Sequence, residues 1–260
     1  MSRQSKIIIY REPEISKVRA AAQASAQVLD RLCIAANPGM STWQLDQLAI
    51  SFIQETGGKS AFYGYNGFPG QICISINEEV VHGIGRKDRI IMLGDLLSID
   101  VGVALDGYIG DNARTICVGR KATGAAAKLL QTTEESLYAG IAAATPRKYV
   151  RDIGAAVQKV VEKAGMHVVR ELVGHGCGRK MHEPPEVPNF KTPGASPILQ
   201  PGMIICIEPM VNMGTHRVVF DRQDHWTVRS MGASLSAHFE HQILITENQP
   251  EILTRWPKTV

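Results

Sequence analysis

The stretch 96-LLSIDVGVALDGYIGDN-112 decides the fold, because it places a turn signal between two segments that can form strands. Residues 96–105 are mostly apolar or β-branched, as a buried β-strand requires. Asp106-Gly107 then supplies the residue pair that is typical of a two-residue hairpin turn. We therefore expect two antiparallel strands in which Leu105 pairs with Tyr108.

Two aspartates of this hairpin are expected on the same face. In the expected register Gly102 faces Asp111, which makes Asp111 a diagonal neighbour of Asp100 with the Cβ atoms roughly 7 Å apart. That separation suits carboxylates that reach toward a cation between them, and an unpaired charge in an apolar strand needs such a partner. The alternative is structural, in which Asp111 accepts hydrogen bonds from Asn112 or Arg114 and Asp100 is only a strand-end carboxylate.

The composition disfavours several classes of protein. The 260 residues carry 28 basic and 25 acidic side chains, and the basic groups are scattered, so we expect no specific nucleic-acid partner. The N-terminal run 1-MSRQSKIIIYRE-12 is too short in apolar residues for a signal peptide, and we expect no membrane span. The cysteines include no Cys-x-x-Cys pair, which favours free thiols in the cytoplasm; they are Cys33, Cys73, Cys117, Cys177 and Cys206.

Two rounds of helices followed by strands organise the chain. Apolar residues at helical spacing predict one helix from Pro13 to Asn37 and a second that begins at Ser41 or Thr42 and ends at Gly57. Residues 183–201 are rich in proline, and we expect an ordered, irregular loop there. Further helices are predicted at 124–144 and 150–164, and further strands at 71–76, 167–170, 203–211 and 238–246. The repeated order suggests two similar halves around one core, and we expect a single domain, 1–260.

Three further polar residues stand where apolar ones would be expected. His175 lies in the run 174-GHGCG-178, where glycines leave the imidazole unobstructed. Glu208 follows an apolar segment and precedes Pro209, and Glu240 alternates with residues that should face the core. Each of these alone has an ordinary interpretation as a satisfied polar group. Together with the two aspartates they make four carboxylates and one imidazole.

An ordered set of motifs extends over nearly the whole chain. The first half holds SINE at 75–78, VHGI at 81–84, IDV at 99–101 and GD at 110–111, and the second half holds GHGCG at 174–178, HEPP at 182–185, IEP at 207–209 and SAHFEH at 236–241. By these motifs the chain resembles the type I methionine aminopeptidases of the pita-bread metallopeptidase family. The resemblance implies an α+β, pseudo-twofold fold, with an antiparallel β-sheet core covered by helices, in one catalytic domain with a short N-terminal segment.

The resemblance also implies a centre of two divalent metal ions. The ligands that it implies are Asp100, Asp111, His175, Glu208 and Glu240, with Asp111 and Glu240 bridging the ions. A set rich in oxygen, with one nitrogen and no thiolate, suits Mn, Fe, Co or Zn. Hydrolysis would then use a metal-bridging hydroxide, as metal pairs supply a nucleophile at neutral pH.

Two histidines and Glu208 would act with the metals. By the same resemblance, Glu208 relays a proton, His182 donates to the developing oxyanion, and His82 contacts the amide beyond the scissile bond. The residues alone leave open the alternative that both histidines are satisfied structural side chains.

A methionine pocket is the next feature that the resemblance implies. Its soft sulfur and aromatic faces would suit a thioether, although the residues alone also allow ordinary loop packing for Phe62 and Cys73. The lining residues are Phe62, Tyr65, Phe68, Cys73, Met181 and Trp226. Met181 stands where the family usually has an aromatic residue, and Gly102 stands where some relatives have a hydroxyl residue. A monovalent cation near Asn77, Glu79 and Ser236 is a further expectation.

The expected activity is removal of the initiator methionine from nascent polypeptides. The setting would be the cytoplasm, near the ribosome exit, with the enzyme as a monomer. One alternative is an Xaa-Pro-type aminopeptidase of the same fold, which usually carries a further N-terminal domain. Another is a non-catalytic pita-bread binding protein, which would lose metal-ligand residues, whereas this chain keeps all of them.

Overall fold

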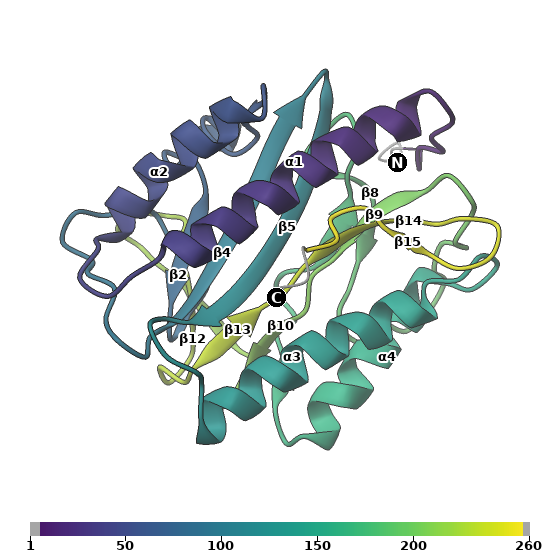
Figure 1. The fold of residues 1–260 in the computed structure, drawn as a ribbon. Helices are drawn as coiled ribbons and strands as arrows, with labels where there is room; N and C mark the ends of the chain where they lie inside the picture. The colour runs from purple at the N-terminus through teal and green to yellow at the C-terminus, as the bar shows by residue number, and fades with distance from the viewer. Residues whose placement is uncertain (1–5, 257–260) are drawn as a thin grey trace.

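A computed structural model describes residues 6–256, which form a mixed helix and strand structure (Figure 1). Residues 1–5, where the predicted N-terminal segment begins, and residues 257–260 lie outside the described part. The helices there are α1 Glu14–Ala35, α2 Thr42–Glu55, α3 Gly124–Ala143 and α4 Val150–Lys163, with a 3-10 turn η1 Tyr65–Gly67. The strands there are β1 Lys59–Ser60, β2 Cys73–Ile76, β3 Glu79–Val81, β4 Leu96–Leu105, β5 Tyr108–Cys117, β6 His167–Val168, β7 Gly174–Gly176, β8 Glu183–Val187, β9 Ile204–Ile207, β10 Met210–Asn212, β11 Val218–Phe220, β12 Val228–Ser230, β13 Ser236–His238, β14 His241–Leu244 and β15 Glu251–Ile252.

The β4–β5 hairpin forms in the predicted register. Asp106 and Gly107 have φ angles of 49° and 81°, as a type I′ turn requires at both of its central positions. Leu105 pairs with Tyr108, and Gly102 pairs with Asp111. The prediction from the Asp-Gly pair is therefore confirmed, and the hairpin is the longest strand pair in the described part of the chain.

Helices α1 and α2 cover one face of this hairpin (Figure 1). Helix α2 begins with a capping box, because Ser41 Oγ accepts from the Gln44 N–H and Gln44 Oε1 accepts from the Ser41 N–H. Helix α1 lies so close to β5 that a Cβ atom at Gly110 would fall 2.2 Å from the carbonyl oxygen of Ala21. The buried apolar cluster between these helices and strands includes Leu29, Leu32, Leu45, Ile53, Ile74, Ile99 and Val101.

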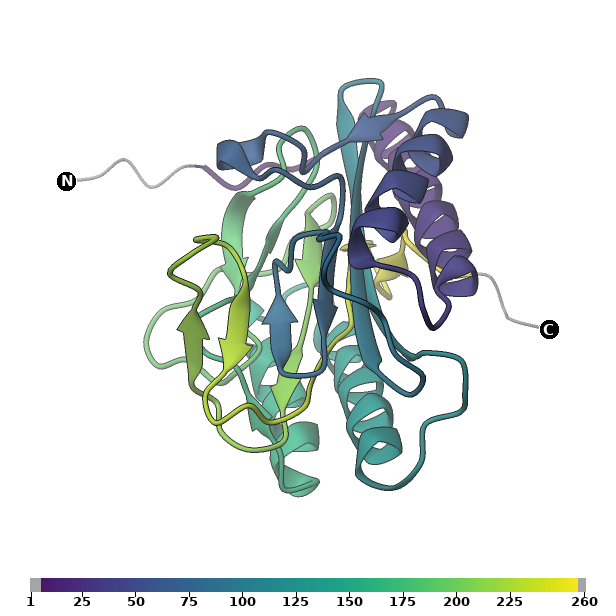
Figure 2. The same cartoon turned by 90° about the vertical axis from the view of Figure 1, so that its left-hand side faces the viewer.

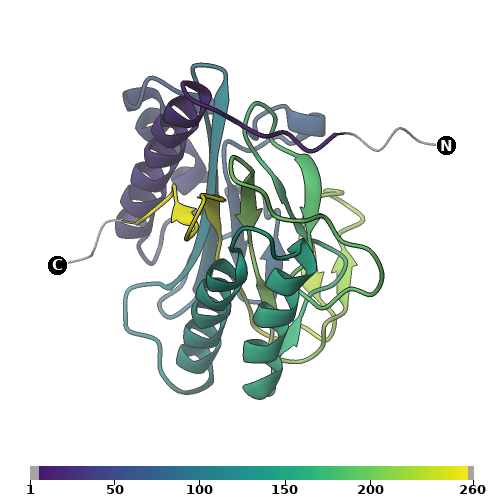
Figure 3. The ribbon, with the colours of Figure 1, turned by 90° about the vertical axis from the view of Figure 1, so that its right-hand side faces the viewer.

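The second half repeats this arrangement. Helices α3 and α4 lie side by side along the sheet of order β15-β14-β9-β7-β8 (Figures 1 and 3). Leu137 of α3 and Val157 of α4 belong to one buried cluster with Ile205 and Ile207 of β9. The two halves thus place paired helices over antiparallel strands, which is the α+β, pseudo-twofold arrangement that was predicted. Within residues 6–256 no helix has the length and apolar character needed to cross a membrane.

The halves meet where β5 runs beside residues 236–241. Thr115 Oγ1 accepts from the His238 N–H, and the Glu240 N–H donates to the Ala113 carbonyl at 2.9 Å. A further sheet, β11-β12-β3, forms another wall of the molecule (Figure 2). These bonds bring Glu240 toward the hairpin that carries Asp111, and we propose on this basis that the chain forms one domain.

Three expectations about strands need correction. Residues 203–211 form two strands, β9 and β10, because Pro209 has no N–H for a ladder and Glu208 faces a cavity. Residues 238–246 are likewise broken at Glu240, whose N–H bonds to β5. The predicted irregular loop contains β8, since the ladder with β7 tolerates Pro184 and Pro185 at a register shift.

The close approach of α1 to β5 leads to a stability prediction. Gly110→Ala should lower the free energy of unfolding by about 1–3 kcal/mol, because the new methyl group must push the α1 backbone away. Urea unfolding monitored by far-UV circular dichroism measures the change. Gly107→Asn is the matched control at the open tip of the same hairpin and should change stability by less than about 1 kcal/mol. Equal stability of the Gly110 variant and the wild type would contradict this packing.

Candidate metal centre

Every residue predicted for the metal centre, the two histidine positions and the methionine pocket lines one cavity of about 190 Å³. The walls come from both halves of the chain, so residues far apart in sequence meet there. The candidate ligands are Asp100 of β4, Asp111 of β5, His175 of β7, Glu208 directly after β9 and Glu240 directly before β14. The structure therefore brings together all the side chains on which the sequence prediction depends.

Two groups of three candidate ligands share one carboxylate. Asp100, Asp111 and Glu240 offer ligand atoms within 4.8 Å of one another, and His175, Glu208 and Glu240 do the same. Asp111 Oδ2 also lies 3.6 Å from His175 Nε2, so it reaches toward the second group. This geometry fits two neighbouring cations with Glu240 and Asp111 between them.

His175 directs a lone pair at carboxylates. Its Nδ1 lies 2.9 Å from the Gly176 carbonyl oxygen, which can only accept, so Nδ1 carries the proton and Nε2 does not. Nε2 lies 3.6 Å from Asp111 Oδ2 and 3.4 Å from Glu208 Oε1. Burial, followed by the proximity of His182, lowers the pKa of His175 to about 3, so the ring is neutral. The backbone bond orients the ring as outer partners orient metal-binding histidines.

Several candidate carboxylates have buried oxygens without hydrogen-bond partners and raised pKa values, as cation-binding carboxylates do when no ion is bound. One oxygen each of Asp100, Asp111 and Glu240 is buried without a hydrogen-bond partner among residues 6–256. Burial raises the pKa of Asp100 to about 7, and burial together with repulsion from Glu240 and Asp100 raises the pKa of Asp111. Arg114, the alternative partner of Asp111, instead pairs with Asp30 at 3.0 Å. The set of carboxylates and one imidazole fits hard or borderline divalent ions, which would satisfy these oxygens.

The two predicted histidines lie at the rim of this group. The ring centroids of His182 and His175 are 4.3 Å apart, and the Tyr65 hydroxyl lies 2.7 Å from His182 Nδ1. Burial lowers the pKa of His182. Burial, with a smaller contribution from His182, lowers the pKa of His82 to about 4. Both rings are therefore neutral near pH 7, and each can donate one N–H and accept at the other nitrogen.

An apolar pocket adjoins the metal-ligand candidates. Phe62, Phe68, Cys73 and Met181 are buried in one cluster, against which Tyr65 and Trp226 are partly buried. The rings of Phe68 and Trp226 meet edge to face, with centroids 5.1 Å apart. A Cβ atom at Gly102 would lie 2.5 Å from Phe62 Cε1. Because Gly102 has no Cβ atom, the Phe62 ring can occupy this space. Gly102 thereby helps to shape the pocket.

Comparison with known proteins agrees with this site. The model of metallopeptidase family M24 matches residues 16–247. The chain is 46% identical over 248 residues to methionine aminopeptidase of Clostridium acetobutylicum, covering 95% of this chain and 98% of that one. The crystal structure of methionine aminopeptidase from Rickettsia prowazekii superposes with a TM-score of 0.93 at 38% identity, covering 96% of this chain and 100% of that one. The chain belongs to metallopeptidase family M24.

The comparison with solved structures also finds a prolidase, which bears on the proline-directed alternative. Prolidase from Pyrococcus furiosus superposes with a TM-score of 0.77 at 20% identity, covering 96% of this chain and 66% of that one. At that identity the likeness shows the shared pita-bread fold alone. The fold prediction is confirmed, and membership in a metallopeptidase family implies divalent metal ions.

Among the cavity-lining residues that the sequence prediction did not name as site residues, His238 is the titratable one. His238 was placed in a motif only, yet it lines the cavity with Nε2 3.7 Å from Glu208 Oε2. That nitrogen is buried and lacks a hydrogen-bond partner within residues 6–256. Burial, followed by the proximity of His82, lowers the pKa of His238 to about 3. The alternation of strand residues, which puts position 238 on the face of Glu240, is the signal that could have found it.

The raised carboxyl pKa values predict how pH affects the metal-free M24 enzyme. The pKa of Asp100 is higher in the folded chain than its ordinary 3.8, so its contribution to stability is fully present below 3.8 and is lost as pH rises to about 7. In Asp100→Asn, urea unfolding of metal-free protein from about pH 5 to about pH 8 should show a smaller loss of stability with pH than in the wild type.

Asp106→Asn, at the exposed tip of the hairpin, is the matched control for that measurement and should keep the wild-type pH dependence. Identical pH dependence in Asp100→Asn and the wild type would contradict the assigned burial of this carboxylate.

Proposed function

We propose that this M24 enzyme is a metal-dependent methionyl aminopeptidase that removes the initiator methionine from nascent proteins. The observation that carries the proposal is the pair of candidate ligand groups that share Glu240, together with an apolar pocket beside them in the same cavity. The similarity to methionine aminopeptidases over nearly the full chain supports the substrate class. A hydrolytic centre and a side-chain pocket in one cavity are what an aminopeptidase requires.

The proposed ligands are Asp100, Asp111, His175, Glu208 and Glu240. Their oxygen-rich chemistry and their unpaired buried acceptors support Mn, Fe, Co or Zn as the ion type. When bound, divalent ions would polarise the scissile carbonyl and lower the pKa of a water molecule. Glu240 and Asp111, which face both groups, would hold the two ions close together, so that both act on one peptide bond.

Glu208 and His182 are proposed to handle protons and charge. Glu208 lines the cavity beside Nε2 of His175 and Nε2 of His238, where a carboxylate can take a proton and return it to the leaving amine. We infer that the Tyr65 hydroxyl donates a hydrogen bond to His182 Nδ1. Nδ1 then accepts, so the proton of the neutral ring is on Nε2. Nε2 is then the donor available to the developing oxyanion.

The pocket is proposed to select the first side chain. Cys73 and Met181 offer sulfur, and Phe62, Phe68 and Trp226 offer aromatic faces. Each contact between sulfur and an aromatic ring contributes about 1 kcal/mol, which favours methionine over an aliphatic residue of similar size. His82 lines the same cavity, with its ring edge-on to Trp226 and the centroids 6.5 Å apart, and we propose that it contacts the next amide of the substrate.

The cellular setting belongs to the same proposal. We assign the enzyme to the cytoplasm, where a monomer would meet nascent chains near the ribosome exit. The monovalent cation also stays a prediction. Near its predicted place the Ser236 N–H donates to the Asn77 carbonyl at 2.8 Å, and Glu79 Oε2 accepts from the Ile76 N–H.

Metal removal and return test the proposed activity. Chelated, metal-free protein should not cleave Met-Gly-Met, and addition of Mn²⁺ or Co²⁺ should restore cleavage, because the ligands supply no nucleophile of their own. Asp111→Asn loaded with the same ion should lose nearly all turnover while its circular dichroism spectrum stays native. Cleavage by chelated protein or wild-type turnover in Asp111→Asn would rule out the proposed centre. Preferential cleavage of Xaa-Pro peptides would instead favour the proline-directed alternative.

Substitutions at His182 and Tyr65 test the proposed donor. His182→Ala should lower kcat by about 10²–10³-fold with little change in KM, because an oxyanion donor acts mainly in the transition state. Tyr65→Phe keeps the ring but removes the hydroxyl, and it should lower kcat by roughly fivefold, as the loss of one orienting hydrogen bond would. His167→Ala, on an exposed residue, is the control. A His182 effect confined to KM would place this ring in substrate binding alone.

A further inference from the structure

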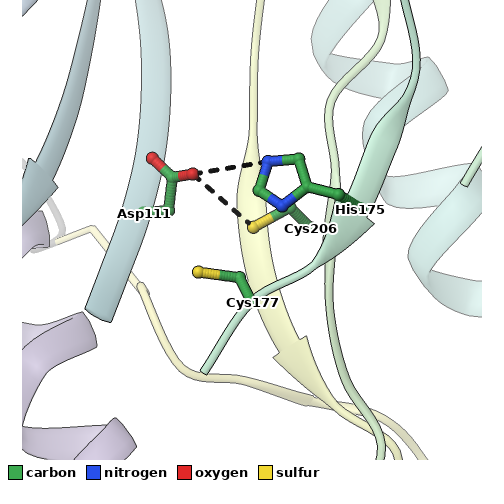
Figure 4. Close-up of side chains that lie close together, drawn as sticks. All are labelled: Asp111, His175, Cys177 and Cys206. Atoms are coloured by element: carbon green, nitrogen blue, oxygen red, sulfur yellow. Dashed lines mark hydrogen bonds and ion pairs between the residues drawn. The ribbon is translucent and has the colours of Figure 1, made fainter. Parts of the chain in front are cut away.

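A third group of candidate ligands overlaps the two groups of the proposed metal centre. Cys177 and Cys206 lie beside Asp111 and His175, and one ligand atom from each of the four residues lies within 4.8 Å of all the others. Figure 4 shows Asp111 reaching from β5 toward His175 and Cys206, with Cys177 below them. We propose that these four side chains form a thiolate site for a soft or borderline divalent ion, Zn²⁺ or Cd²⁺, and that occupation of this site excludes the catalytic pair of ions.

Two of the distances between the four ligand atoms are close to the edges of a tetrahedral zinc site, and all of them are within 4.8 Å. Zinc bonds of roughly 2.0 Å to nitrogen or oxygen and 2.3 Å to sulfur give ligand-to-ligand edges of roughly 3.3–3.8 Å. Asp111 Oδ2 lies 3.6 Å from His175 Nε2 and 3.9 Å from Cys206 Sγ. Asp111, His175 and Cys206 therefore need only small movements to enclose an ion, and Cys177 lies within 4.8 Å of each of them.

The backbone holds the ligands in place. Cys177 follows β7 and donates its N–H to the Ile204 carbonyl of the adjacent strand β9, which carries Cys206. Both thiols are buried. His175 presents an unprotonated Nε2, because Nδ1 is bound to its neighbouring carbonyl, and Asp111 Oδ1 has no partner among residues 6–256. The four side chains thus converge from three strands of the two halves of the fold, as a built site does.

The thiolate site and the catalytic centre cannot be filled together. His175 has a single lone pair at Nε2, and Asp111 is the carboxylate proposed to bridge the catalytic ions, so an ion bound by the thiols removes ligands from both proposed positions. Coordination of Zn²⁺ or Cd²⁺ would replace the two thiol protons, which pass to solvent. Thiolates prefer such ions over Mn²⁺, whereas carboxylates alone do not make this distinction. Zinc in excess would therefore inhibit by moving into the thiolate site.

Cadmium binding to metal-free, reduced protein tests the site without any use of activity. The ultraviolet charge-transfer band of thiolate-bound cadmium should saturate at one ion per chain in the wild type, fall strongly in Cys177→Ser and Cys206→Ser, and stay at full height in Cys33→Ser, whose thiol lies elsewhere. Thermal unfolding checks that each variant is folded, and the two single variants guard against failure of one of them. A band that is absent in the wild type, or unchanged in both variants, would overturn the proposal.

Zinc inhibition of the manganese-loaded enzyme tests the exclusion, and this second test rests on the proposed function. With each rate normalised to the uninhibited rate of the same variant, the zinc concentration for half-inhibition should rise at least about tenfold in Cys177→Ser, since loss of an outer partner alone weakens metal sites by that factor. Cys33→Ser should match the wild type. If the cadmium band forms but zinc inhibits all variants equally, the exclusion is wrong; if no peptide is cleaved at all, the function fails while the binding result stands.

Discussion

The structure depends on one constraint. Several carboxylates are buried within a few ångströms of one another, where they repel one another. Asp100, Asp111, Glu208 and Glu240 would not stay together without compensation, because burial raises the pKa of each carboxylate. Repulsion from neighbouring carboxylates raises the pKa values of Asp111, Glu208 and Glu240 further. Covalent continuity does not hold them in place, since they come from strands of both halves. The antiparallel core holds them instead, through ladder and cross-half bonds such as that from the Glu240 N–H to Ala113. A fold that accepts this arrangement is one whose stability in use includes bound cations.

The same core explains why the pocket is apolar on one side and charged on the other. Side chains of strand β4 alternate, so Asp100 faces the cavity while Ile99 and Val101 enter the buried cluster beneath α1 and α2. Gly102 has no side chain, so the Phe62 ring can pack against strand β4 there. The aromatic wall of the cavity therefore adjoins the charged wall. A substrate would thus meet an apolar pocket next to the candidate metal ligands. Strand β4 carries both Asp100 and Gly102 and so fixes the position of the pocket relative to the ligands.

Local signals predicted what local physics determines. The Asp106-Gly107 turn gave the β4–β5 register to the residue, and hence the diagonal placement of Asp100 and Asp111, because a type I′ turn leaves no freedom in pairing. Convergence of His175 and Glu240 on that hairpin was implied only by a resemblance, since no spacing encodes contacts between distant strands. Strand β8 was missed because prolines usually argue against strands, and His238 was missed because its role depends on a neighbour, Glu208, that only tertiary structure supplies.

The cysteines also show that sequence spacing does not predict contacts between distant strands. Sequence spacing gave Cys177 and Cys206 no partner, yet β7 and β9 pair so that both sulfurs stand beside Asp111 and His175. A site with hard oxygen ligands on one side and soft sulfur on the other can accept both hard and soft ions. Which ions occupy it then depends on the relative availability of hard and soft metals. Because Asp111 and His175 belong to both arrangements, the choice of metal and the choice between active and blocked enzyme become one equilibrium, governed by the same two side chains.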